Sequence, residues 1–133
     1  MLLSNSTIFI AFNITYMLYL KYQLVYYKRS SGREPVKDYL YELKEDERIE
    51  IRQLFRLLLE KEGRLVPPQA KHIFKKIWEL RIQYLNRYHR IFYFIGPNRK
   101  IVLLSAFQKK SKKTPRSEIQ KAHNYYIDYL NAL

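Results

Sequence analysis

The order of hydrophobic and polar positions from residue 21 onward predicts a strand followed by two helices. The run Tyr22–Lys28 is rich in aromatic and β-branched residues, which favours a strand. A helix is predicted after Pro35, because proline is tolerated in a first helical turn. A second helix is predicted over Glu45–Glu62, where acidic residues at the start suit the helix dipole and Gly63 is a natural stop. Apolar residues recur on one face of each helix, as Val36, Tyr39, Leu40 and Leu43 in the first and Ile51, Leu54, Phe55 and Leu58 in the second.

The second half of the chain predicts three strands and a last helix. The β-like runs are Ile77–Ile82, Tyr88–Ile95 and Lys100–Phe107, and their short connections predict antiparallel neighbours. Thr114 is predicted as the N-cap and Pro115 as the first residue of the final helix. The order strand, helix, helix, three strands, helix predicts an α+β fold in one domain over residues 21–133. The apolar face of the final helix carries Ile119, Ala122, Tyr126 and Leu130.

Residues 1–20 carry no charge and stand apart from this pattern. Polar residues interrupt their apolar run, which lacks the positive start and the cleavage site of a secretory signal. Two interpretations stay open: a membrane-leaning extension, or a natural start at Met17 with the earlier residues translated from upstream sequence. We favour the start at Met17, and N-terminal mass spectrometry of the native protein would test it, since an intact Met1 would exclude it.

The chain is strongly basic. Its 25 Lys and Arg residues against 12 Asp and Glu residues leave a formal net charge of +13. Such a field attracts polyanions, of which nucleic acid or a nucleic-acid machine is the commonest and an anionic membrane surface the next. The alternative is that a small basic protein simply stays soluble. The absence of cysteine excludes disulfides and thiolate chemistry and fits a reducing cytoplasm.

Sequence motifs for metal, nucleotide or nucleophilic chemistry are absent. His72, His89 and His123 lie far apart without metal-ligand spacing, and the three glycines form neither a phosphate-binding loop nor a nucleophile elbow. Any catalysis must therefore come from Arg, Lys, His, Tyr and carboxylate side chains, and we expect neither a metal nor a cofactor.

Three segments together resemble the RelE superfamily and, within it, the HigB-like toxins. They are Trp78–Arg81 (Trp-Glu-Leu-Arg), Tyr88–Tyr93 (an aromatic strand with an arginine near its start) and Leu103–Pro115 (a buried strand running into lysines and a helix). Each segment is weak alone, but their order and spacing after a strand and two helices are specific. The resemblance covers about Tyr22 to Leu130.

The resemblance implies a compact, microbial-ribonuclease-like α+β fold with a curved antiparallel sheet, two N-terminal helices and a C-terminal helix. It implies a cytoplasmic toxin of a type II toxin–antitoxin system that cuts messenger RNA on the ribosome and arrests growth. Its expected partners are the ribosome, messenger RNA and a helix-turn-helix antitoxin of the HigA type, which alone would contact operator DNA. No membrane partner is expected.

RNA can be cut without a metal when its 2′-hydroxyl attacks the adjacent phosphate and cations stabilise the transition state. The family pattern assigns this stabilising role to Arg90, and Arg81 is a second candidate that either binds phosphate or braces Arg90. An ordinary salt bridge with Glu79 is the alternative for both. Lys109 and Lys110 complete the predicted catalytic set, although clustered lysines are usually a solvated surface. RNA or ribosome binding is assigned to Lys112, Lys113, Lys75 and Lys76.

The general acid and base are not identified by the sequence. Some RelE-type toxins carry lysines on the strand that here reads Ile77–Glu79, and this chain has none there. Strand alternation also places His89 on the face opposite Arg90, so a structural role for His89 stays open. The remaining aromatic residues Trp78, Phe92 and Phe107 are predicted to be core. The candidate acids and bases are His89, Glu79, Tyr88, His123, Tyr125 and Tyr126.

Three other functions compete with the ribonuclease. A ParE-like toxin would keep the fold and poison DNA gyrase, a class that does not depend on the basic cluster after Phe107. A non-catalytic module would bind RNA or the ribosome without cutting. A membrane-associated protein is the alternative that residues 1–20 suggest.

Overall fold

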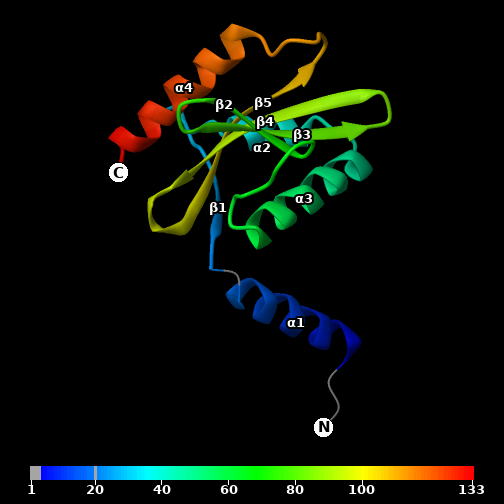
Figure 1. The fold of residues 1–133 in the computed structure, drawn as a ribbon. Helices are drawn as coiled ribbons and strands as arrows, with labels where there is room; N and C mark the ends of the chain where they lie inside the picture. Colours follow the sequence, from blue (N-terminus) through cyan, green and yellow to red (C-terminus); the bar gives the residue numbers. More distant parts are fainter. Residues whose placement is uncertain (1–3, 20) are drawn as a thin grey trace.

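The computed structural model describes residues 4–19 and 21–133, and it confirms the predicted α+β class. Residues 1–3 and 20 of the predicted extension lie outside the described residues, as does the side chain of Met17. In chain order the elements are α1 (Asn5–Tyr19), β1 (Gln23–Tyr26), α2 (Pro35–Tyr41), α3 (Glu45–Glu60), β2 (Ala70–Phe74), β3 (Ile77–Tyr84), β4 (Arg87–Gly96), the 3₁₀ turn η1 (Pro97–Arg99), β5 (Lys100–Lys109) and α4 (Arg116–Asn131) (Figure 1).

The strands form one open, curved sheet in the order β1-β5-β4-β3-β2 (Figure 1). The predicted antiparallel pairing of β3 with β4 and of β4 with β5 is confirmed, whereas β1 joins β5 in parallel. β2 is a strand that the sequence reading missed, and it pairs antiparallel with β3. The segment has only five residues, Ala-Lys-His-Ile-Phe, and its apolar and polar residues do not alternate clearly enough to show the period of a strand.

Helices cover both faces of the sheet. One face packs on α2 and α3 through a core that includes Leu40, Ile51 and Leu80. The other face packs on α4 through a second core that includes Phe94 and Ala122. Helix α4 begins only at Arg116, after the loop that follows β5. In the described part of the chain, no helix therefore covers the second face around the start of β4 and the end of β5 (Figure 1). This part of the sheet carries the candidate site.

Helix α1 stands apart from the two cores (Figure 1). In the part of the chain that the structure describes, no helix combines the length and the apolar character needed to cross a membrane. Several large apolar side chains of α1 are nevertheless exposed: Ile8, Phe9, Ile10, Phe12 and Ile14.

A buried polar network joins α2, α3 and β4 beneath the sheet. The Tyr39 hydroxyl lies 2.5 Å from His89 Nδ1, and His89 Nε2 lies 2.7 Å from Glu47 Oε1. Arg87 forms a bidentate ion pair with the same carboxylate. His89 and Glu47 are 0% and 1% exposed, so this network is part of the core. Burial lowers the pKa of His89, while the Arg87 guanidinium holds the pKa of Glu47 below its usual range.

The free energy of unfolding is expected to fall as the pH is lowered from about 8 to about 5.5. Burial lowers the pKa of His89 in the folded state, so the folded chain binds a proton at His89 less tightly than the unfolded chain does. The unfolded chain takes up a proton at an ordinary histidine pKa of about 6.5, so acid favours unfolding. The pKa of Glu47 is also lowered in the folded state. Its contribution to the free energy of unfolding is therefore lost only when the pH falls below the ordinary range of glutamate pKa values. Urea unfolding across this pH range measures the slope, and NMR titration of the His89 ring identifies the group. A flat profile would contradict this assignment.

Candidate functional site

Strand register gathers the predicted cations on one face of the sheet. Arg81 of β3 lies directly opposite Arg90 of β4, and Tyr88 of β4 lies opposite Lys109 of β5. Because side chains two residues apart share a face, these four residues point to the same side, which is the side of α4. His89, between Tyr88 and Arg90, points to the other side, as its spacing predicted.

Glu79 is the buried centre of this face. Its side chain has no solvent exposure, yet its carboxylate accepts a hydrogen bond from Arg81 Nε at 3.0 Å. The same oxygen lies 3.5 Å from Arg90 Nε. The other oxygen accepts a hydrogen bond from the Thr114 hydroxyl at 2.9 Å. Both oxygens are therefore engaged, and Glu79 orients the two arginines while it ties the loop after β5 to the sheet.

The predicted pairing of Glu79 with arginine is thus present, but it is buried and shared between two arginines. Arg90 is 9% exposed, and its Nη1 donates to the main-chain oxygen of His89 at 3.1 Å. This hydrogen bond and the nearby Glu79 carboxylate hold the guanidinium where it lines the groove. A salt bridge and a phosphate-binding role are therefore compatible in Arg81 and Arg90.

An open groove of about 650 Å³ adjoins the Glu79 centre. Arg90 and Tyr88 supply its floor from β4, and Lys109 contributes from the end of β5. The loop after β5 and the β3–β4 turn form its two sides. The residues that line it are Asn86, Tyr88, Arg90, Gln108, Lys109, Lys110, Ser111 and Lys112.

The electrostatics of the groove favour an anion. Burial lowers the pKa of Arg90, and the neighbouring Arg81 adds to this effect while Glu79 opposes it. Burial, followed by the charge of Arg90, also lowers the pKa of Lys109. Like charges held close together repel one another, and a phosphate bound between them relieves that repulsion. A lysine with a lowered pKa also gives up its proton more readily, which suits a general acid.

The remaining predicted cations lie in two other places. Lys113 is exposed in the loop between β5 and α4, where the Ser111 hydroxyl donates to its main-chain oxygen. Lys75 and Lys76 are exposed at the β2–β3 turn, at the other end of β3 from the groove.

The predicted acids and bases are divided between the two faces of the sheet and helix α4. Tyr88 lines the groove, where it is 43% exposed, whereas His89 belongs to the buried network. His123 of α4 packs against Phe74 near the β2–β3 turn. Two further candidates on α4 pack into the second core: Tyr125 stacks on Tyr27, and Tyr126 contacts Phe94.

Two residues of this site were missed by sequence reasoning. Thr114 was predicted as a helix N-cap, and this is wrong by one position, because Pro115 is the N-cap and α4 begins at Arg116. Its hydroxyl binds Glu79 instead of a helix end. Lys71 lies on β2 directly opposite Glu79, and its charge contributes to the lowered pKa of Lys109. Recognition of β2 as a strand would have been the signal for Lys71.

Groups of three or more His, Asp or Glu side chains that could hold a metal ion do not occur within residues 4–19 and 21–133. The ion pairs make the site a set of cations around one buried carboxylate. Such a set can bind a phosphodiester, stabilise extra negative charge on it and deliver a proton.

Comparison with known proteins gives one family match. No curated protein matches the chain. The family model described as phage-derived protein Gp49-like (DUF891) matches residues 38–126, a span that contains Glu79, both arginines and the lysine loop. Members of this family are associated with RelE/ParE-like toxins of toxin–antitoxin systems. Because the match covers more than half of the chain, the protein belongs to the Gp49-like family of phage-derived, toxin-like proteins.

Proposed function

We propose that this protein is the toxin of a type II toxin–antitoxin pair and a metal-independent endoribonuclease that cuts messenger RNA. The observation that carries the proposal is the convergence of Arg81, Arg90 and Lys109 around buried Glu79, beside an open groove. Family membership supports the toxin part of the proposal. The cationic groove supports the ribonuclease part over a gyrase poison, because that class does not depend on a basic cluster.

In the proposed reaction the scissile phosphate lies in the groove against Arg90. The 2′-hydroxyl attacks the phosphorus, the bond to the 5′-oxygen breaks, and a 2′,3′-cyclic phosphate forms. Arg90 and Arg81 stabilise the extra negative charge, and Glu79 positions both. Lys109 protonates the departing 5′-oxygen. Tyr88 lines the groove, and we propose that its hydroxyl oxygen accepts the 2′-hydroxyl proton while its own phenol proton passes to water in the open groove.

The lysines outside this centre have a proposed binding role. Lys110 and Lys112 line the groove, and Lys113 follows them in the same exposed loop. We propose that they hold the RNA backbone in the decoding site of a cytoplasmic ribosome, as in HigB-like toxins. The proposed antitoxin is a helix-turn-helix protein encoded by a neighbouring gene.

The test is RNA cleavage by the purified chain, with and without ribosomes and in the presence of EDTA. We expect cuts within translated frames that leave a 2′,3′-cyclic phosphate, that persist in EDTA and that are lost in the double variant Arg90→Ala with Lys110→Ala. The matched control, Arg64→Ala, removes an exposed arginine remote from the groove and should cut normally. Intact messages alongside trapped gyrase–DNA breaks in cells would overturn the proposal, and so would RNA binding without cleavage.

The pH dependence of cleavage tests Lys109 as the acid. The reaction needs the protonated amine, so activity should fall as the pH rises through the pKa of Lys109. Because burial and Arg90 lower that pKa, the fall should occur below the ordinary lysine range. Single-turnover rates measured from about pH 6 to 10 give the profile. Lys109→Arg should remove this alkaline limb and lower the plateau, whereas Lys61→Ala, an exposed control, should leave the profile unchanged. An identical limb in Lys109→Arg would exclude Lys109.

A further inference from the structure

Within residues 4–19 and 21–133, no strand pairs with the outer edge of β3 over its last residues. β2 pairs with β3 only as far as Leu80, and the Arg81 amide then donates to the Gln69 main-chain oxygen at 2.8 Å. β3 continues to Tyr84, paired on its other side with β4. Main-chain groups of alternate residues in an antiparallel strand point to the same edge. The N–H and C=O of Gln83 therefore face outward on the same side as the Arg81 amide.

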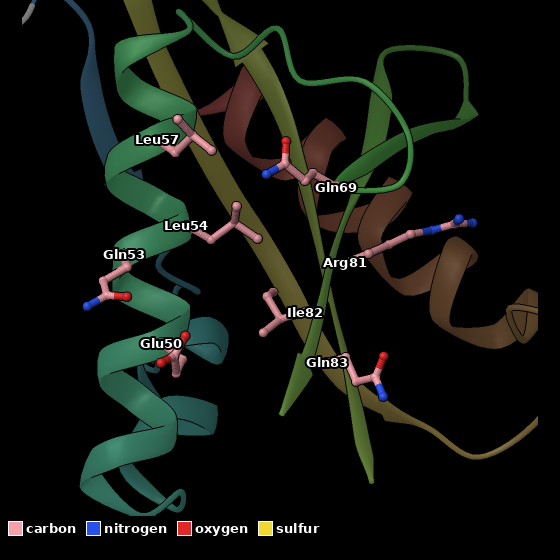
Figure 2. Close-up of a pocket in the computed structure, with 8 residues that line it drawn as sticks. All are labelled: Glu50, Gln53, Leu54, Leu57, Gln69, Arg81, Ile82 and Gln83. Atoms are coloured by element: carbon pink, nitrogen blue, oxygen red, sulfur yellow. The ribbon is translucent and has the colours of Figure 1, made fainter. Parts of the chain in front are cut away.

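A cleft of about 340 Å³ runs along this free edge. Figure 2 shows Leu54 and Leu57 of α3 on one wall and Ile82 of β3 on the other, with their side chains pointing into the space between. Leu54 and Leu57 are half-buried here, because none of the described strands continues the sheet beneath this part of α3. The cleft therefore offers main-chain hydrogen-bonding groups and an apolar wall together.

The two faces of the edge differ in charge. Arg81 and Gln83 point to the face of the Glu79 centre, and Ile82 points to the face of α3. Figure 2 shows the Arg81 side chain directed away from α3. A strand added at this edge would place alternate side chains against Leu54 and Leu57, and the others beside Arg81. Exposed Glu50 also lines the cleft, and it belongs to α3, on the side where the apolar side chains of the strand would lie.

We infer that this edge binds an extended segment of a partner protein in which apolar and acidic side chains alternate. The main-chain groups of Gln83 supply strand pairing, which a peptide can satisfy and a nucleic acid cannot. The apolar residues fill the cleft, and an acidic residue pairs with Arg81. A second copy of this chain is disfavoured because each copy carries a net charge of +13, which an acidic segment complements.

The inferred segment has a consequence for activity that rests on the proposed function. An acid beside Arg81 would compete with the phosphate for one of the two arginines held by Glu79. The segment would thus belong to the antitoxin and would inhibit without filling the groove. The binding itself does not depend on this, and it can be measured on a chain that cuts no RNA.

Two synthetic peptides of identical composition test the binding. One alternates valine and glutamate over nine residues, and the other carries the same residues in two blocks. Fluorescence anisotropy with the full chain should show the alternating peptide binding about tenfold more tightly. In NMR spectra the Gln83 amide should shift with the alternating peptide. Equal affinity for both peptides would overturn the inference.

Strand pairing is tested from both partners. Gln83→Pro removes the outward N–H without touching the β3–β4 ladder and should weaken binding about tenfold, whereas Gln83→Ala should not. Two further peptides carry N-methyl groups on every second amide, one on the odd-numbered amides and the other on the even-numbered amides. Methylation of the amides that face β3 should abolish binding, whereas methylation of the outward amides should spare it, with no change to the protein. Equal binding by both methylated peptides would contradict strand pairing. A dimer of the free chain that Gln83→Pro dissolves would show that the occupant is a second copy.

Discussion

Replacing Arg90 with alanine is expected to slow RNA cleavage by about 10²–10³-fold, the loss typical when one preorganised donor to a transition-state anion is removed. Arg90 is held beside Glu79 and by the main-chain oxygen of His89, and it already lines the groove before RNA binds. This preorganisation is the reason for the size of the effect. Single-turnover cleavage of a messenger fragment on ribosomes measures it.

Arg90→Lys separates charge from geometry. Lysine keeps the positive charge but lacks the planar fork that engages two phosphate oxygens, so an intermediate rate is expected. Arg64→Ala is the matched control, and unfolding curves show whether each variant is folded. A rate for folded Arg90→Ala within about threefold of the parent would rule out Arg90 as the stabilising group.

Glu47→Ala should cause the largest loss of stability, about 3 kcal/mol or roughly 10 °C in the unfolding midpoint. Glu47 is 1% exposed and pairs with Arg87 and His89, which lie on β4. Its removal leaves a buried imidazole and a half-buried guanidinium without their common acceptor. The loss of stability exceeds the free energy that the ion pair itself contributes, because the groups left behind are removed from water and have lost their partner.

Glu50→Ala provides the comparison one helical turn further on. Glu50 is exposed on the same helix, so its replacement should change the free energy of unfolding by less than about 0.5 kcal/mol. Thermal and urea unfolding of both variants measure the difference. Similar small losses in the two variants would show that the buried network contributes little.

Much of the fold follows from local pattern. The helical spacing of Ile51, Leu54, Phe55 and Leu58 predicted α3, and three of these side chains are buried or line the core, while Leu54 lines the cleft. The strand period predicted β3, β4 and β5 to within about two residues. It also predicted that Arg90 and His89 face opposite sides, because that relation depends only on neighbouring positions.

The candidate site depended on contacts between distant segments. Arg81, Arg90 and Lys109 could be named from sequence, but their common partner Glu79 was considered only as a salt-bridge alternative and a possible acid or base. That Glu79 is buried, and that Thr114 binds it from 35 residues away, follows from the packing of the loop after β5. Lys71 reaches the site through β2, a strand too short to show a period.

By itself, then, the sequence determined which segments are helices or strands and which side chains share a face, since both depend on the local spacing of apolar residues. Tertiary structure alone decided the parallel pairing of β1 with β5, the place of β2 and the free edge of β3 beyond it. It also decided that the cations gather around one carboxylate. These features depend on register between segments far apart in the chain, which is set by burial of both sheet faces and is not encoded in any single segment.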